Sequence, residues 1–122
     1  MVRTTGLYHV HLVVRDLDRS LRFYTEVFGM QERFRAGPKM VFLNTPGSGD
    51  IITLNEDPNE AHLAGRNGGI AHFGFQLADP ATLDAAIAEI ERAGGRLVER
   101  GKHGGHVPFA YVADPDGYVI EI

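Results

Sequence analysis

Cysteine is absent from this chain of 122 residues. Neither a disulfide framework nor a thiolate zinc site can therefore form, and any metal ion would have to be held by His, Asp or Glu. Positive charge is also scarce: the formal net charge is −4 and no basic tract occurs, which argues against nucleic acid or an anionic membrane surface as the main partner. No apolar run reaches the length of a membrane span, and the opening "MVRTTG" lacks the apolar stretch of a signal peptide. We therefore expect a cytoplasmic protein with neither a membrane nor a nucleic-acid partner.

The residues that are present suit a small globular protein. Hydrophobic residues make up 43% of the chain and charged residues 23%, which allows the core of one domain or of two small joined halves. Alternating apolar residues predict a strand over 7–14, and helical spacing between a capping Asp16 and Gly29 predicts a helix. Short strands are expected in "MVFLNT" and "DIITLNE", whereas the polar, Gly-rich stretch over 56–69 is expected to be a linker.

The second half of the chain repeats this pattern. "HVHLVVRD", which starts at His9, matches "HFGFQLAD", which starts at His72: each has a His, apolar residues of the opposite parity, and then an Asp that begins a helix. Strands are expected after the second helix in "RLVE", "FAYVAD" and "YVIEI". Such repetition predicts two tandem β-α-β-β-β modules, over residues 1–60 and 68–122, in a single α+β domain.

Three side chains could form a metal site. His9 and His72 occupy equivalent positions of the two repeats, each on the strand face opposite the apolar residues, and Glu121 lies on the corresponding face of the last strand. Two His and one carboxylate form the facial triad that suits Fe(II), Mn(II), Ni(II) or Zn(II) and leaves positions open for a substrate or dioxygen. A sheet that curls into a cup would direct both histidines into one cavity. We therefore expect these three residues to bind a divalent metal ion.

Three stretches of the chain, "HVHLVVRDLDRSLRFYTEVFGM", "GIAHFGFQL" and "AYVADPDGYVIEI", resemble the vicinal oxygen chelate superfamily. This superfamily includes glyoxalase I, extradiol dioxygenases, fosfomycin-resistance enzymes and bleomycin-resistance proteins. The resemblance implies paired βαβββ modules that form a cup-shaped mixed sheet, with metal ligands at His9, His72 and Glu121. It also implies a homodimer, in which His9 of one subunit can complete a site with the other two ligands of its partner.

The resemblance also bears on the type of reaction. Glyoxalase I enzymes use a fourth ligand, Glu or Gln, at a position that resembles Thr53, and Thr is a poor ligand. Asn55 shares the strand face of Thr53, whereas Glu56 has the opposite parity and would need a β-bulge to reach the site. Extradiol dioxygenases use only the triad, and "GKHGGHVPFAYVADPDGYVIE" resembles their final segment. That resemblance implies His103 as an acid/base and Tyr111 as a donor to bound oxygen, so an Fe(II)-dependent dioxygenase is the favoured function.

Other activities stay open. A glyoxalase I-type lyase or isomerase would use Ni(II) or Zn(II). A fosfomycin-type thiol transferase, usually with Mn(II), would have Thr where this chain has His11. A bleomycin-resistance-like protein would sequester an antibiotic without a metal, which the intact triad disfavours. His103 and His106 are both expected in a Gly-rich loop. The polar residues expected to contact a small-molecule substrate are His11, Thr53, Asn55 and His106.

Overall fold

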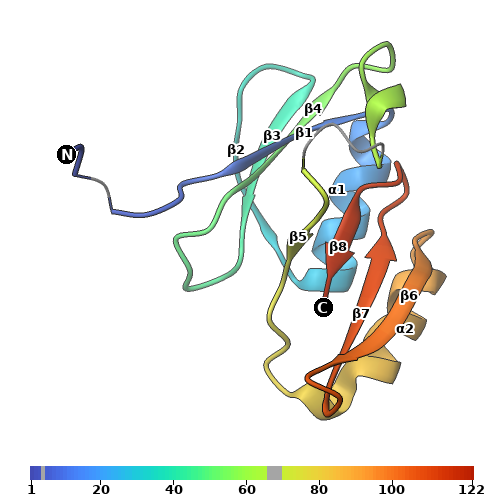
Figure 1. Ribbon diagram of the computed structural model, residues 1–122. Coiled ribbons are helices and arrows are strands. Elements are labelled where there is room, and N and C mark those ends of the chain that lie inside the picture. The colour runs from blue at the N-terminus through green and yellow to red at the C-terminus, as the bar shows by residue number, and fades with distance from the viewer. Residues whose placement is uncertain (4, 66–69) are drawn as a thin grey trace. The chain divides into compact units, whose positions relative to one another are not determined.

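The computed structural model describes residues 1–3, 5–65 and 70–122, which form two compact units, Met1–Glu60 and Ala61–Ile122. Each unit contains a four-stranded mixed sheet and one α-helix (Figure 1). In both units the order along the chain is β-α-β-β-β. The predicted α+β fold built from two βαβββ repeats is therefore confirmed.

The first unit has the strand order β1-β4-β3-β2. Strand β1 is parallel to β4, and the other neighbouring strands are antiparallel. The elements are β1 (Val10–Val14), α1 (Leu17–Phe28), β2 (Gln31–Arg35), β3 (Met40–Asn44) and β4 (Ile52–Glu56).

The second unit has the equivalent order β5-β8-β7-β6, with β5 parallel to β8 and the other pairs antiparallel. Two short 3-10 turns precede its α-helix. The elements are η1 (Ala61–Leu63), β5 (Phe73–Gly74), η2 (Pro80–Thr82), α2 (Leu83–Arg92), β6 (Arg96–His103), β7 (Val107–Ala113) and β8 (Val119–Glu121).

Local signals in the sequence explain where the helices begin and end. The Asp16 carboxylate accepts a hydrogen bond from the backbone N–H of Arg19 at 3.0 Å, and Gly29 ends α1 in the left-handed region at φ 65°. In the second unit the Asp79 carboxylate accepts from the backbone N–H of Ala81 at 2.9 Å, at the start of η2. The predicted helix signals at Asp16, Gly29 and Asp79 are confirmed.

One face of each sheet is apolar and is buried on the side of its own helix (Figure 1). Burial of each Leu, Ile or Val there contributes roughly 1.5–3 kcal/mol, and a slip of one residue would turn those side chains to solvent. Register is therefore strongly specified, and the opposite face is left for polar side chains. The buried strand residues are Leu12, Val14, Val41, Leu43, Ile52 and Leu54 in the first unit and Ala110, Val112 and Ile120 in the second.

Three strands differ from expectation. Strand β2 was not predicted, because all five of its residues are exposed and show no apolar alternation. Strand β5 is short, so that His72 precedes it. Strand β6 extends as far as His103, which corrects the expectation that His103 lies in a loop. Gly104 and Gly105, at φ 58° and 79°, form a tight turn that lets the hairpin pair up to His103. Within the described ranges, no helix has the length and apolar character needed to cross a bilayer.

Candidate active site

The face of the second sheet that points away from α2 carries four of the predicted site residues. Glu121 on β8 is the direct register partner of Tyr111 on β7 and of Gly74 on β5. His103 ends β6, and His72 lies two residues before Gly74, where alternation places it on the same face. Because register partners project to the same side of a sheet, these side chains converge on Glu121.

The Glu121 carboxylate lies between two imidazoles. Its Oε1 is 2.6 Å from Nε2 of His103, and its Oε2 is 3.0 Å from Nε2 of His72. An ionised carboxylate can only accept hydrogen bonds, so both Nε2 atoms carry a proton in this arrangement. The side chains of Glu121, His72 and His103 are 26%, 33% and 55% exposed, so the cluster is open to a small molecule or an ion.

These contacts stabilise the charged form of Glu121. The hydrogen bond from His103 is the largest cause that holds the pKa of Glu121 below its ordinary value of 4.5. The charges of both imidazoles and the hydrogen bond from His72 act in the same direction, whereas desolvation opposes them. Glu121 is therefore an anion at neutral pH, which is the form in which a carboxylate binds a metal ion.

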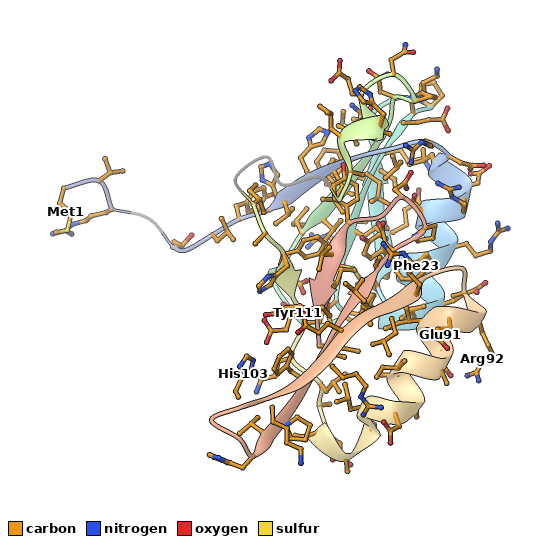
Figure 2. The ribbon with its side chains drawn as sticks, turned by 45° about the vertical axis from the view of Figure 1, so that its right-hand side comes forward. Met1, Phe23, Glu91, Arg92, His103 and Tyr111 are labelled. Atoms are coloured by element: carbon orange, nitrogen blue, oxygen red, sulfur yellow. The ribbon has the colours of Figure 1, made fainter. Side chains whose placement is uncertain are left out.

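Aromatic rings join the two sides of this cluster. Tyr111 packs against His72 with the ring centroids 4.8 Å apart, and Phe109 packs against Tyr111 at 5.1 Å. His103 stacks on Phe109 at 4.1 Å with an interplanar angle of 16°. Figure 2 shows His103 and Tyr111 together on the side of the sheet opposite α2. The contacts close a ring of five side chains, in which Glu121 is the only formal anion.

A hollow of about 400 Å³ opens beside His103 and Glu121. Apart from these two and Gln76, the described residues that line it are apolar or Gly, and none is Lys or Arg. The apolar lining consists of Phe75, Leu77, Pro80, Leu83, Val107, Pro108, Phe109 and Ile122. The hollow suits an uncharged, apolar part of a small molecule.

The donor atoms of His72 and Glu121 fit a divalent metal ion. Imidazole nitrogen and carboxylate oxygen are both ligand types that such ions take, and the two atoms lie 3.0 Å apart. Across the residues that the structure describes, no group of three His, Asp or Glu side chains is arranged to hold a metal ion. The second unit thus brings together two of the three predicted ligands.

The other predicted residues lie in the first unit. His9 is exposed and immediately precedes β1, with its ring edge-on to Tyr8 at a centroid distance of 5.2 Å. His11 on β1 is the register partner of Thr53 on β4, and Asn55 follows Thr53 on the same face. This is the face opposite the buried apolar residues of the first sheet.

Thr53 and Glu56 differ sharply in their hydrogen bonding. The Thr53 side chain is 1% exposed, and its Oγ1 has no hydrogen-bond partner among the described residues. The Glu56 carboxylate accepts a hydrogen bond from the backbone N–H of Leu17 at 2.9 Å, at the start of α1. Strand β4 pairs in unbroken register with β1 and β3, so no bulge turns Glu56 to the polar face. Its carboxylate caps α1 instead.

Two residues of the cluster were not predicted from the sequence. Phe109 belongs to the ring of side chains and lies two positions before Tyr111; Gly101 lies beneath the Phe109 ring and two positions before His103, so strand parity was the signal that could have found both. His106 lies in the hairpin turn, where its Nδ1 is 2.8 Å from the carbonyl oxygen of Gly104.

Comparisons with known proteins place this fold among relatives with several activities. A model of the Glyoxalase/Bleomycin resistance protein/Dioxygenase superfamily matches residues 6–122. The catechol-2,3-dioxygenase of Bacillus subtilis (strain 168) is 33% identical over 124 residues, which span 97% of this chain but only 41% of that protein. The probable lactoylglutathione lyase of Vibrio parahaemolyticus is 36% identical over 128 residues, which span 95% of this chain and 88% of that protein.

A solved structure shares the fold. A variant of the fosfomycin resistance protein FosX from Listeria monocytogenes, complexed with Mn(II) and dihydroxypropylphosphonic acid, has a TM-score of 0.76 at 22% identity. The match covers 98% of this chain and 89% of that one.

Proposed function

This chain belongs to the Glyoxalase/Bleomycin resistance protein/Dioxygenase superfamily, and from that membership we propose that it is a metal-dependent dioxygenase of the extradiol type. Members of the superfamily are typically dependent on a divalent metal ion, as in the Mn(II) complex of the fosfomycin resistance protein. The proposed substrate is a small molecule with two adjacent oxygens, and the proposed co-substrate is dioxygen.

His9, His72 and Glu121 are the proposed metal ligands. His72 and Glu121 already lie side by side, and His9 is exposed at the start of the first sheet. Fe(II) is the favoured ion, with Mn(II), Ni(II) or Zn(II) as alternatives. A bound ion of this kind supplies Lewis acidity and leaves positions open for substrate and dioxygen. Because His72 donates from Nε2 in the metal-free arrangement, its ring must move that proton to Nδ1 before Nε2 can bind an ion.

His103 and Tyr111 are the proposed acid–base and donor groups. Nε2 of His103 lies 2.6 Å from Oε1 of Glu121, where a substrate hydroxyl beside the carboxylate could exchange a proton with the imidazole. Tyr111 is the register partner of Glu121 and offers a phenol O–H on the same face. The apolar hollow next to them, with no Lys or Arg in its described lining, favours an uncharged aromatic substrate. His11, Thr53, Asn55 and His106 are the further proposed substrate contacts.

The observation that carries this proposal is the contact between His103 and Glu121. It brings an acid–base group within hydrogen-bond distance of a proposed metal ligand, although the two are 18 residues apart. The register of β6 with β7 and of β7 with β8 brings the two side chains to the same face.

A lactoylglutathione lyase-type activity is the second candidate, because the Vibrio parahaemolyticus relative matches this chain over most of both lengths. Two observations count against it. Thr53 stands at the position that resembles the fourth ligand, and the neighbouring carboxylate of Glu56 caps α1.

Metal analysis of protein purified without added metal or chelating resin is the first test. We expect about one equivalent of a divalent ion per chain, lost in each of His9→Ala, His72→Ala and Glu121→Ala. Asp50→Ala is a suitable control, because Asp50 lies in an exposed loop of the first unit and, among the described residues, bonds to Thr45 and Ser48 alone. A metal-free wild type that binds an organic ligand equally well with and without His9 would indicate a binding protein instead.

Activity assays then distinguish the dioxygenase, lyase and transferase reactions. Fe(II) reconstitution without oxygen, followed by dioxygen uptake with a panel of catechols, should show consumption that is lost in His103→Gln and reduced in Tyr111→Phe. Isomerisation of a hemithioacetal with Ni(II) or Zn(II), without dioxygen uptake, would identify a lyase. Thiol addition to an epoxide with Mn(II) would identify a transferase.

A mixing experiment tests whether a homodimer shares its sites. His9→Ala and Glu121→Ala subunits are each expected to be inactive. If one subunit supplies His9 and its partner supplies Glu121, refolding the two variants together restores one intact site per mixed dimer. Absence of any restored activity, with mixed dimers present, would assign the whole site to one chain.

A further inference from the structure

We propose that Gly101 and Phe109 are positioning residues for His103: the bare glycine leaves room for the tip of the Phe109 ring on β6, and that ring holds His103 in place beside Glu121. The inference rests on the proposed function only for the catalytic role of His103. The stacking itself is a property of the second unit.

A glycine is needed at position 101 because the Phe109 ring occupies the space of a side chain, and not because the backbone there has a conformation that only glycine adopts. Gly101 on β6 and Phe109 on β7 are direct register partners. A Cβ built on Gly101 would lie 2.6 Å from Cζ and 2.7 Å from Cε1 of Phe109, far inside the usual carbon–carbon contact of about 3.5–4.0 Å. Gly101 is not among the glycines with positive φ, so an alanine would be tolerated by the backbone. The space that the missing side chain leaves is filled by the aromatic ring.

The Phe109 ring in turn orients His103. The two rings stack at 4.1 Å with an angle of 16° between their planes. His103 is 55% exposed and stands on the edge strand of its sheet, so the Phe109 ring and the Glu121 carboxylate are its main restraints. With its face against Phe109, the imidazole points Nε2 at Glu121 at 2.6 Å. An unsupported His103 would sample other rotamers and would spend less time at that carboxylate.

Misplacement of an acid–base group lowers the rate of chemistry more than it lowers binding. A displacement of about 1 Å can cost on the order of 100-fold in rate. We therefore expect Gly101→Ala to lower kcat by roughly 10–100-fold, with KM nearly unchanged.

The experiment uses the full chain with four variants. Gly101→Ala introduces the clash, and Phe109→Leu removes the ring without a clash. The double variant tests whether the two residues act through one contact. Gly49→Ala is the matched control, because a Cβ at Gly49 meets nothing within 4 Å and its φ is not positive.

The two readouts are steady-state kinetics of the Fe(II)-loaded enzyme and NMR of the histidine ring protons in the metal-free protein. A ring stacked on Phe109 should show His103 signals shifted upfield, assigned by their loss in His103→Gln. Gly101→Ala and Phe109→Leu should both remove that upfield shift and lower kcat. The kcat of the double variant should be no lower than that of Phe109→Leu, and Gly49→Ala should match the wild type in both readouts.

Two results would overturn the inference: a Gly101→Ala variant that keeps both the shifted signals and the wild-type kcat, or a double variant whose losses multiply. If Gly101→Ala does not fold, Phe109→Leu tests the inference by itself. The inference requires that this variant lose the upfield shift of the His103 signals and have a lower kcat. The NMR readout needs neither metal nor turnover. A wild type with the shifted signals but no dioxygenase activity would therefore refute the proposed function and leave the positioning contact standing.

Discussion

The buried hydroxyl of Thr53 allows a stability prediction that runs against the usual effect of mutation. Its side chain is 1% exposed and its Oγ1 has no hydrogen-bond partner among the described residues. A buried polar group without a partner costs roughly 1–3 kcal/mol, because its bonds to water are lost and not replaced. Valine has nearly the same shape without the hydroxyl. Thr53→Val should therefore stabilise the protein.

The size of the effect follows from that penalty. Removal of the hydroxyl should raise the free energy of unfolding by about 1–2 kcal/mol, helped slightly by the preference of valine for a central strand. For a domain of this size the melting temperature should rise by roughly 3–10 °C. Most core substitutions shift stability in the opposite direction.

Urea unfolding followed by circular dichroism measures this prediction. The midpoint should rise while the m-value, which reports the surface exposed on unfolding, stays unchanged. Thr25→Val is the matched control, because the Thr25 hydroxyl donates to the Leu21 carbonyl at 2.9 Å and its loss should cost about 0.5–1.5 kcal/mol. If Thr53→Val destabilises as Thr25→Val does, the Thr53 hydroxyl has a partner in solution and the reasoning is refuted.

The same variant bears on function. If Thr53 keeps its hydroxyl for substrate, the stabilised Thr53→Val protein should bind substrate more weakly, which is the usual trade-off between stability and activity. Thr53→Ser retains the hydroxyl and should retain affinity. Equal affinity of all three proteins would remove Thr53 from the proposed substrate contacts.

Three further predictions concern single carboxylates. In the metal-free protein the pKa of Glu121 is lowered, so its hydrogen bond with His103 stabilises the fold above the ordinary carboxyl pKa, and this stabilisation is lost as the pH falls through the lowered pKa. The free energy of unfolding of the wild type should therefore exceed that of Glu121→Gln by less in acid than at neutral pH. A difference that grows in acid would contradict the assignment. The Asp114 Oδ1 accepts from the backbone N–H groups of Asp116, Gly117 and Tyr118, in and just after the "DPDG" turn. Asp114→Ala should therefore lower the unfolding free energy by about 2–3 kcal/mol in urea titrations, and Asp114→Asn by less. Asp16→Ala removes the cap of α1 and should cost about 1 kcal/mol, whereas a neutral result would show that the Glu56 carboxylate caps the helix alone.

Much of the fold could be predicted from local sequence. Caps such as Asp16 and Gly29 act within a few residues, and their effect does not depend on the rest of the protein. Strand alternation likewise separates the buried face from the polar one, as Leu12 and His11 show. Strand β2 escaped prediction because an edge strand exposed along its whole length carries no such signal.

The site could be predicted only in part. Parity assigned His72 and Glu121 to the polar face of their strands, the family resemblance implied Tyr111, and the structure brings these three together. Local sequence pattern alone could not link His103 to Glu121, because their contact depends on the register of β6 with β7 and of β7 with β8. The expected Gly-rich loop around His103 is in fact the end of a strand.

The sequence by itself determined the two βαβββ repeats, their helix caps and, within the second unit, the polar face on which His72 and Glu121 lie, because each depends on neighbours along the chain. The tertiary structure alone decided that His103 meets Glu121, that Phe109 rests on Gly101 and that Glu56 caps α1. These contacts join residues that are distant in sequence, and only strand register and packing determine which of them come within a hydrogen bond of one another.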